Sequence, residues 1–276
     1  MNTPTYTLGI SPCPNDTYIF EALLHGRVQA PFSVIPHMAD VEELNTLARK
    51  GELAITKLSV GVLPHVLERY IIINAGAALG RGCGPLLVSR AGSAKAKNSR
   101  IVTPGRLTTA NLLLSLHGGF TGPREHLLFD QVMPALQQAQ AELGLIIHEG
   151  RFTYASHGLE LVQDMGQWWE QTTGLPLPLG VIAVRRDLGM QTALAVQNAI
   201  AASLKYARNH PEQSREFIRA HAQEMDSKVM AAHIATFVTD FSEDLGQEGR
   251  NAIRTLVQAA CKEAGQPLPD AQFFAE

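Results

Sequence analysis

The residues of this 276-residue chain best suited to chemistry follow a short apolar run. Residues 145–147 are Leu-Ile-Ile, and His148, Glu149 and Arg151 come directly after them. Such a run predicts a buried strand, and the carboxyl ends of strands in open α/β sheets are where ligands bind. An imidazole there is poised to remove a proton near neutral pH, although a buried structural histidine fits the same position. Glu149 and Arg151 either orient the imidazole or pair with each other in solvent.

Three expected helix starts each follow a predicted strand, at Asn15, Ser59 and Thr108. If they face one cleft, their unpaired N–H groups and aligned dipoles favour a carboxylate or phosphate, and hydroxyls at Ser59 and Thr109 add donors. Simple helix capping is the alternative reading at each of these positions. Lys57 follows a predicted strand, so its ammonium group either holds the substrate anion or reaches out to solvent.

Cysteines and the remaining histidines suggest less chemistry. Cys13 lies between two prolines beside a helix start, so its thiol is either an activated nucleophile or a small group packed in a tight turn. The three cysteines are widely spaced and show no Cys-x-x-Cys pair, which argues against a disulfide framework or a zinc site. The other histidines lack metal-ligand spacing, and we expect those in helical or tail segments, including His233, to lie at the surface.

Composition restricts the classes of partner. Hydrophobic residues make up 45% of the chain, charged residues 18%, and the net charge is −3. These values predict a globular core and argue against nucleic acid or an anionic membrane as the main partner. The first eight residues resemble no secretory signal, and no apolar stretch approaches the roughly 18 residues of a membrane span. We therefore expect a cytoplasmic, reduced protein.

Strands alternate with helices along most of the chain. Strands are predicted at residues 6–10, 32–38, 53–56, 70–74, 85–89, 101–103, 145–147, 160–163 and 180–185. Helices are predicted after the turn at 11–16, at 41–50, 60–67, 107–116, over most of 127–143, at 166–174, and throughout the tail from residue 187. This alternation predicts an α/β fold with largely parallel strand pairing.

A small, basic and polar stretch at residues 91–100 separates two strand-helix sections. It is either a connection between lobes or an exposed loop. We expect one lobe to comprise residues 1–88 and 179–276 and the other to comprise residues 89–178. A chain that crosses to a second lobe and returns leaves a cleft between the two.

Five segments together resemble one enzyme family, the 1,4-dihydroxy-6-naphthoate synthases of the futalosine route to menaquinone. The similarity extends from residue 8 to about residue 187, and the His-Glu-Gly-Arg-Phe-Thr-Tyr run is its most specific part. The segments are Ser-Pro-Cys-Pro-Asn-Asp-Thr at 11–17, Lys-Leu-Ser at 57–59, Thr-Thr-Ala at 108–110, residues 147–154, and Trp-Trp at 168–169 with Leu-Pro-Leu-Pro-Leu-Gly at 175–180.

This resemblance implies a two-lobed fold like that of the type II periplasmic binding proteins, with the ligand closed between the lobes. It also implies a cofactor-free, metal-free carbon–carbon lyase that acts on cyclic dehypoxanthine futalosine, a small carboxylate, with His148 as the proton acceptor. By the same similarity, the substrate is bound by Lys57, Leu58, Ser59, Thr109 and Ala110. A homodimer is compatible with the sequence.

Two other functions fit parts of the pattern. A solute-binding protein for a small carboxylate shares the expected fold but ordinarily requires export, for which no signal is evident. The sister enzyme that dehydrates chorismate belongs to the same pathway and has the same fold. Turnover of chorismate or of the cyclic futalosine derivative distinguishes the three readings.

Overall fold

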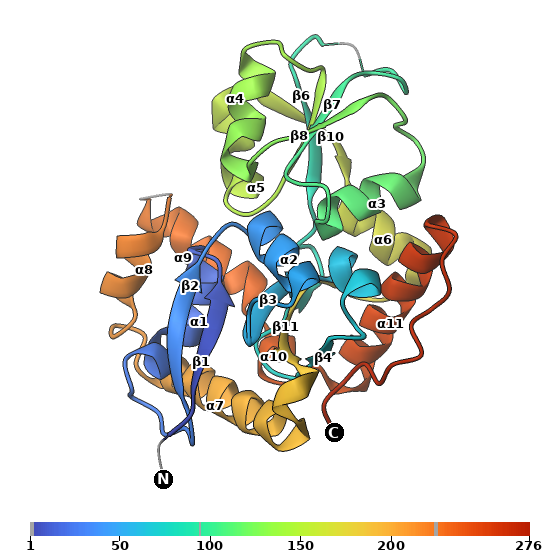
Figure 1. Ribbon diagram of the computed structural model, residues 1–276. Helices are drawn as coiled ribbons and strands as arrows, with labels where there is room; N and C mark the ends of the chain where they lie inside the picture. The colour runs from blue at the N-terminus through green and yellow to red at the C-terminus, as the bar shows by residue number, and fades with distance from the viewer. Residues whose placement is uncertain (1–2, 94, 224–225) are drawn as a thin grey trace.

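The computed structural model describes residues 3–93, 95–223 and 226–276, which form two lobes, each around one mixed β-sheet (Figure 1). The first sheet contains, in spatial order, β2 (Ser33–Met38), β1 (Thr5–Ile10), β3 (Ile55–Ser59), β11 (Leu177–Arg185) and β4 (Tyr70–Ile72), with β5 (Ala78–Gly80) paired to β11. The second sheet contains β10 (Leu159–Asp164), β6 (Leu86–Arg90), β9 (Leu143–Ile146), β7 (Ile101–Thr103) and β8 (Arg124–His126).

The chain builds most of the first sheet, crosses to the second lobe after β5, and returns through β11. The expected lobe boundary at residue 88 therefore falls inside β6, which pairs with strands of the second sheet only. The outgoing connection follows β5 and the returning connection leads into β11. Since β5 pairs with β11, both connections between the lobes lie beside these two strands. The cleft between the lobes is consequently bordered by β3, by β11 and by the strand ends of the second lobe.

Helices cover both sheets. On the first lobe these are α1 (Pro14–Leu24), α2 (Val41–Lys50), the 3₁₀ helices η1 (Val60–His65) and η4 (Arg186–Leu188), α7 (Met190–Asn209), α8 (Arg215–His221), α9 (Ser227–Phe237), α10 (Asp240–Glu243) and α11 (Gly246–Glu263). On the second lobe they are α3 (Thr109–His117), η2 (Phe129–Gln131), α4 (Val132–Gln137), α5 (Gly150–Thr153), η3 (Tyr154–His157) and α6 (Met165–Thr173). Helices α7, α8 and α9 of the tail all contact α1, so the tail packs close to the cleft.

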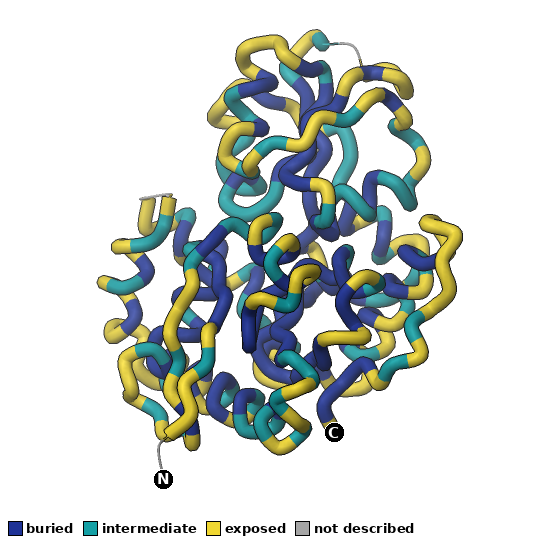
Figure 2. Tube along the Cα trace, in the orientation of Figure 1, coloured by how far each residue is buried: buried dark blue, intermediate teal, exposed yellow. Residues whose placement is uncertain are grey.

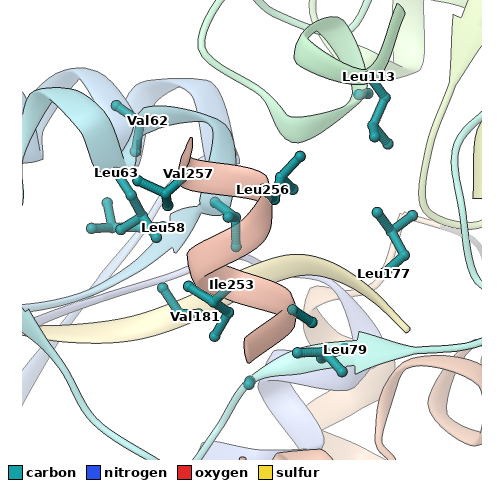
Figure 3. Close-up of a cluster of buried hydrophobic side chains, with 14 of the residues drawn as sticks. Leu58, Val62, Leu63, Leu79, Leu113, Leu177, Val181, Ile253, Leu256 and Val257 are labelled. Carbon is teal, nitrogen blue, oxygen red and sulfur yellow. The ribbon is translucent and has the colours of Figure 1, made fainter. Parts of the chain in front are cut away.

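The buried core follows the central strands (Figure 2). Helix α11 contributes Ile253, Leu256 and Val257 to the largest apolar cluster, where they lie close to Leu58 and Val181 of the first sheet (Figure 3). Because successive side chains of a strand alternate between faces, the burial of Leu58 on this side directs its neighbours Lys57 and Ser59 to the other side. The core thus determines which residues of β3 face the cleft.

Two predictions about secondary structure are wrong. Pairing is mixed, because β11 runs antiparallel to β3, β4 and β5, and β6 runs antiparallel to β9 and β10. Of residues 127–143, only Val132–Gln137 form an α-helix, and Gly144 lies inside β9 where we expected it to end a helix. A Cβ atom at Gly144 would lie 2.6 Å from Leu136 Cδ1, so this glycine permits close packing of α4 on β9.

Gly84 lies where the chain enters the second lobe, and it packs against Gly166 at the start of α6. A Cβ atom at Gly84 would lie 2.3 Å from both the N and Cα atoms of Gly166. Backbone atoms cannot move aside as the end of a flexible side chain can. We therefore expect Gly84→Ala to lower the free energy of unfolding by about 1–3 kcal/mol. Urea denaturation measures this change.

Gly80→Ala is the matched control for that substitution. Its Cβ atom would meet only Thr239 Cγ2, at 3.3 Å, and Cys83 Sγ, at 3.6 Å. We expect a clearly smaller loss at Gly80. Equal losses at the two positions would contradict the explanation by backbone contact.

Among residues 3–93, 95–223 and 226–276, no helix is both long enough and apolar enough to cross a membrane.

Candidate active site

A cavity of about 690 Å³, counting the part open to solvent, lies between the lobes and is bordered by residues of both. A concave site lined by residues of two lobes is a typical place for a small organic ligand. Six of the seven residues singled out from the sequence line it, namely His148, Lys57, Ser59, Thr109, Ala110 and Asn15. The seventh, Leu58, is not among the lining residues, because its side chain lies in the core on the opposite face of β3.

Ser59 is held in place by Asn45 of α2. Its Oγ accepts a hydrogen bond from Asn45 Nδ2 at 3.0 Å, and its backbone N–H donates to Asn45 Oδ1 at 2.9 Å. Ser59 lies at the end of β3, directly before η1, and its side chain makes no capping hydrogen bond. The hydroxyl hydrogen is therefore oriented by Asn45 and remains available to a ligand oxygen.

The start of α3 combines capping with contact between the lobes. Thr108 Oγ1 accepts from Asn111 N at 3.2 Å, so the capping reading is correct for this residue. Thr109 Oγ1 donates to Leu179 O of β11 at 2.7 Å and accepts from Gly61 N at 3.1 Å. Since the Thr109 hydroxyl already has two partners, the N–H groups of the first turn are the donors this helix start offers to an anion.

The start of α1 carries its own carboxylate. Asp16 is fully buried and accepts hydrogen bonds from Ser11 N at 3.1 Å, Ser11 Oγ at 2.8 Å and Asn15 Nδ2 at 2.8 Å. Its other partner is the ammonium group of Lys57, with which it forms a buried ion pair. Lys57 is thus fixed in the wall of the cleft and does not reach out to solvent. The helix start at Asn15 already carries an anion, the carboxylate of Asp16.

His148 lies two residues beyond the end of β9, in a left-handed conformation with φ of 55°. A left-handed backbone is uncommon for residues other than glycine, and such positions gather at functional sites. Its Nδ1 atom is 3.5 Å from Cys13 Sγ, and its ring makes an edge-to-face contact with Phe129, with 4.8 Å between ring centres. The arrangement leaves Nε2 as the nitrogen for the cavity that His148 lines.

The surroundings of His148 keep it neutral. Burial by the surrounding protein lowers the pKa of the imidazole to about 4; Asp16 opposes this shift and the Lys57 ammonium group adds to it. A neutral imidazole is the form that can accept a proton. The ring is therefore unprotonated throughout the neutral pH range, which is the state that a base requires.

Cys13 does not have the environment of a nucleophile. Burial raises the pKa of its thiol well above the usual value, and the carboxylate of Glu149 raises it further. The reactive thiolate is accordingly disfavoured. Cys13 is instead a neutral thiol packed against His148 Nδ1.

Arg151 pairs with neither of the partners considered from the sequence. Its guanidinium donates to Gly84 O at 2.6 Å and to Asp164 Oδ2 at 3.0 Å. The expected ion pair between Glu149 and Arg151 is therefore replaced by one between Arg151 and Asp164. These contacts hold Arg151 in the cavity wall, beside the chain crossing at Gly84.

The expectation of a surface role for His233 is wrong. This residue of α9 is 1% exposed, and its Nε2 atom lies 3.1 Å from Asn15 Oδ1. Its ring is parallel to that of His148, with 6.0 Å between the ring centres and 11° between the planes. Met230, His233 and Phe237 are all buried, and their spacing marks one face of the helix. This periodicity was the signal in the sequence that could have predicted the burial of His233.

Acid is expected to destabilise the protein partly through His148. Its pKa is about 4 in the folded state and about 6.5 in the unfolded chain, so only the unfolded state takes up this proton between those values. Folding stability should therefore fall by up to about 3 kcal/mol as pH drops from 6.5 to 4. We expect His148→Gln to lose less stability than the wild type across this window in urea titrations. Parallel curves for the two proteins would show that the His148 imidazole is not desolvated.

In the described part of the chain, no group of three or more His, Cys, Asp or Glu side chains is placed to hold a metal ion.

Comparison with known proteins identifies relatives along nearly the whole chain. Residues 6–262 match a family model described as menaquinone biosynthesis. A protein of Thermus thermophilus named 1,4-dihydroxy-6-naphtoate synthase is 47% identical over 267 residues, which cover 96% of this chain and 98% of that protein. A protein of the same name from Streptomyces coelicolor is 42% identical, with 99% of this chain and 100% of that protein covered.

Solved structures support the two-lobed architecture. A crystal structure of an Archaeoglobus fulgidus protein has a TM-score of 0.89 and 30% identity, with coverage of 95% of this chain and 98% of that one. The ligand-binding component of an ABC-type import system from Staphylococcus aureus has a TM-score of 0.71 at 14% identity, with coverage of 98% and 96%. The fold is therefore that of the periplasmic binding proteins, as the resemblance implied.

Proposed function

Because this chain belongs to the menaquinone biosynthesis family, we propose that it is a 1,4-dihydroxy-6-naphthoate synthase, a lyase that acts on cyclic dehypoxanthine futalosine with His148 as general base. The observation that carries the proposal is that six residues from four separate segments of the chain line one cleft, with a neutral imidazole among them. The names of the two near full-length relatives give the reaction class.

In the proposed mechanism, His148 Nε2 removes a proton from the bound substrate. Cleavage of a carbon–carbon bond follows, the sugar-derived fragment leaves, and aromatisation of the new ring supplies driving force. The positive charge that develops on His148 is favoured by the carboxylate of Asp16, which raises the pKa of the imidazole. The proposal requires the tautomer with its hydrogen on Nδ1, facing Cys13 Sγ, because the lone pair of the neutral ring is then on Nε2.

The carboxylate of the substrate is proposed to lie against the start of α3. The N–H groups of Thr109 and Ala110 belong to the first turn of this nine-residue helix, where the helix dipole favours an anion. The hydroxyl of Ser59, oriented by Asn45, supplies a further donor from the opposite lobe. A carboxylate held from both lobes fixes the distance between the reacting part of the substrate and His148.

Contacts between the lobes close the cleft around this position. The carboxylate of Glu42, on α2, accepts hydrogen bonds from the backbone of the second lobe, from Arg106 N at 2.8 Å and from Leu107 N at 2.9 Å. Together with the bond from Thr109 to Leu179, these contacts join the lobes beside the start of α3. Closure of this kind excludes water and aligns the base.

Incubation of the purified protein with cyclic dehypoxanthine futalosine, monitored by naphthoate absorbance, tests the proposal. We expect product from this substrate and no reaction with chorismate. Turnover of chorismate would indicate the sister dehydratase, and binding of the cyclic compound without product would indicate a solute-binding protein. Either outcome would refute the assignment.

A further inference from the structure

We propose that His233 is a positioning residue of this active site, which orients the Asn15 amide and fixes the ring of His148. The inference rests on the proposed function, because it assigns the task of base to His148. It concerns a residue of the C-terminal helices, outside the segments that carry the family resemblance. Its evidence is a set of contacts that join α9 to the cleft.

The first contact fixes the orientation of the Asn15 amide. Asn15 Nδ2 donates to Asp16 Oδ1 at 2.8 Å, which directs Asn15 Oδ1 towards His233 Nε2 at 3.1 Å. An amide oxygen accepts only, so the hydrogen of the neutral His233 ring must be on Nε2. Asn15 is left with one further N–H, and because Asn15 lines the cavity it offers a donor to an oxygen of the ligand.

The second contact restrains His148. The ring of His233 lies parallel to that of His148, Phe129 packs on His148 edge-on, and Cys13 Sγ faces Nδ1. A residue with φ of 55° depends on its surroundings to hold an uncommon backbone conformation. Loss of the His233 ring would remove one of the surfaces that keep Nε2 directed at the cavity.

The environment of His233 keeps its ring neutral, which suits a positioning role. Burial, the approach of His148 and the ammonium group of Lys57 all lower its pKa well below the usual value. Asp16 and Glu149 are the acidic groups on this side, with Glu149 Oε2 lying 3.8 Å from His233 Nδ1. His233 therefore stays neutral when His148 takes up a proton, and the repulsion between two charged rings 6.0 Å apart is avoided.

Plain packing is the competing explanation, because Phe152 and Phe237 also contact the ring of His233, at 6.4 Å and 4.6 Å between ring centres. Two variants separate the two explanations. His233→Phe keeps an aromatic ring beside His148 but cannot donate to Asn15. His233→Gln keeps an N–H near the position of Nε2 but removes the ring.

Steady-state kinetics with the cyclic substrate should show opposite effects in the two variants. We expect His233→Phe to raise KM about tenfold, with kcat within about threefold of wild type, because a hydrogen bond that orients a binding group is lost. We expect His233→Gln to lower kcat about tenfold, with KM within about threefold, because the base is less well aligned. A packing role predicts that both parameters change together in both variants. That result, or unchanged kinetics in both, would overturn the inference.

A measurement without substrate keeps this inference separate from the proposed function. Two-bond proton–nitrogen spectra of the histidine-labelled protein report the tautomer of each ring. We expect the Nε2–H tautomer of His233 between pH 6 and 8, and loss of this preference in Asn15→Leu. If the wild type fails to convert the cyclic substrate, the proposed function fails, and the tautomer alone then decides this inference. An Nδ1–H tautomer in the wild type would overturn it.

Discussion

His148→Gln is expected to lower kcat for the cyclic substrate by a factor of about 10² to 10⁴, which is the usual contribution of a positioned general base. Glutamine has a similar reach but cannot accept a proton at neutral pH. The substrate contacts proposed for Ser59 and the start of α3 do not involve His148, so KM should change much less than kcat. Absorbance of the naphthoate product under saturating substrate measures the effect.

The backbone at residue 148 requires a second variant. Since φ is 55° there, a new side chain can cost stability independently of its chemistry, and asparagine tolerates the left-handed region better than glutamine does. His148→Asn should therefore fold at least as well as His148→Gln and be equally inactive. Activity near that of the wild type in either folded variant would refute the role of His148 as base.

The residues that line the cleft were easier to predict from the sequence than the pairing of the strands. The apolar run before His148, the polar residues after it and the capping pattern near Thr108 are local signals, and the structure brings these residues to one cleft. Helix α2 was predicted with the bounds that it has, Val41–Lys50, because its N-cap and C-terminal glycine are also local features. Pairing direction depends on distant segments, and β11 enters the first sheet only after the chain has passed through the second lobe.

The burial of two single residues could not be predicted, for the same physical reason. Lys57 and His233 are polar residues whose burial depends on partners far away in sequence, Asp16 for the lysine and Asn15 for the histidine. No local pattern specifies those partners. The helical periodicity of the tail likewise reports only that one face of each helix is buried. It does not report that α1, and therefore the cleft, lies against that face.

Asp16→Ala is expected to reduce the free energy of unfolding by about 3–5 kcal/mol, because it leaves the Lys57 ammonium group buried without a counter-charge. The side chain of Asp16 is fully buried and that of Lys57 is 8% exposed, so water replaces neither partner easily. Asp16 also accepts from Ser11 N and Ser11 Oγ, and those donors lose their partner as well. Urea denaturation at pH 7 measures the loss, and turnover should fall with it, since Asp16 also favours protonation of His148.

Removal of both charges isolates the contribution of the pair. Lys57→Met alone should also destabilise, because the carboxylate of Asp16 then lacks its cation, whereas Asp16→Ala combined with Lys57→Met should cost less than the sum of the two single changes. Glu248→Ala is the surface control, because it breaks the ion pair between Glu248, whose side chain is 53% exposed, and Arg81, whose side chain is 50% exposed. It should reduce the free energy of unfolding by at most about 1 kcal/mol. The burial of the pair indicates that Asp16 neutralises the charge of Lys57. A loss from Asp16→Ala no larger than that from Glu248→Ala would contradict this. A large loss confined to the single variants would instead show that the cost arises from leaving one charge buried without its partner.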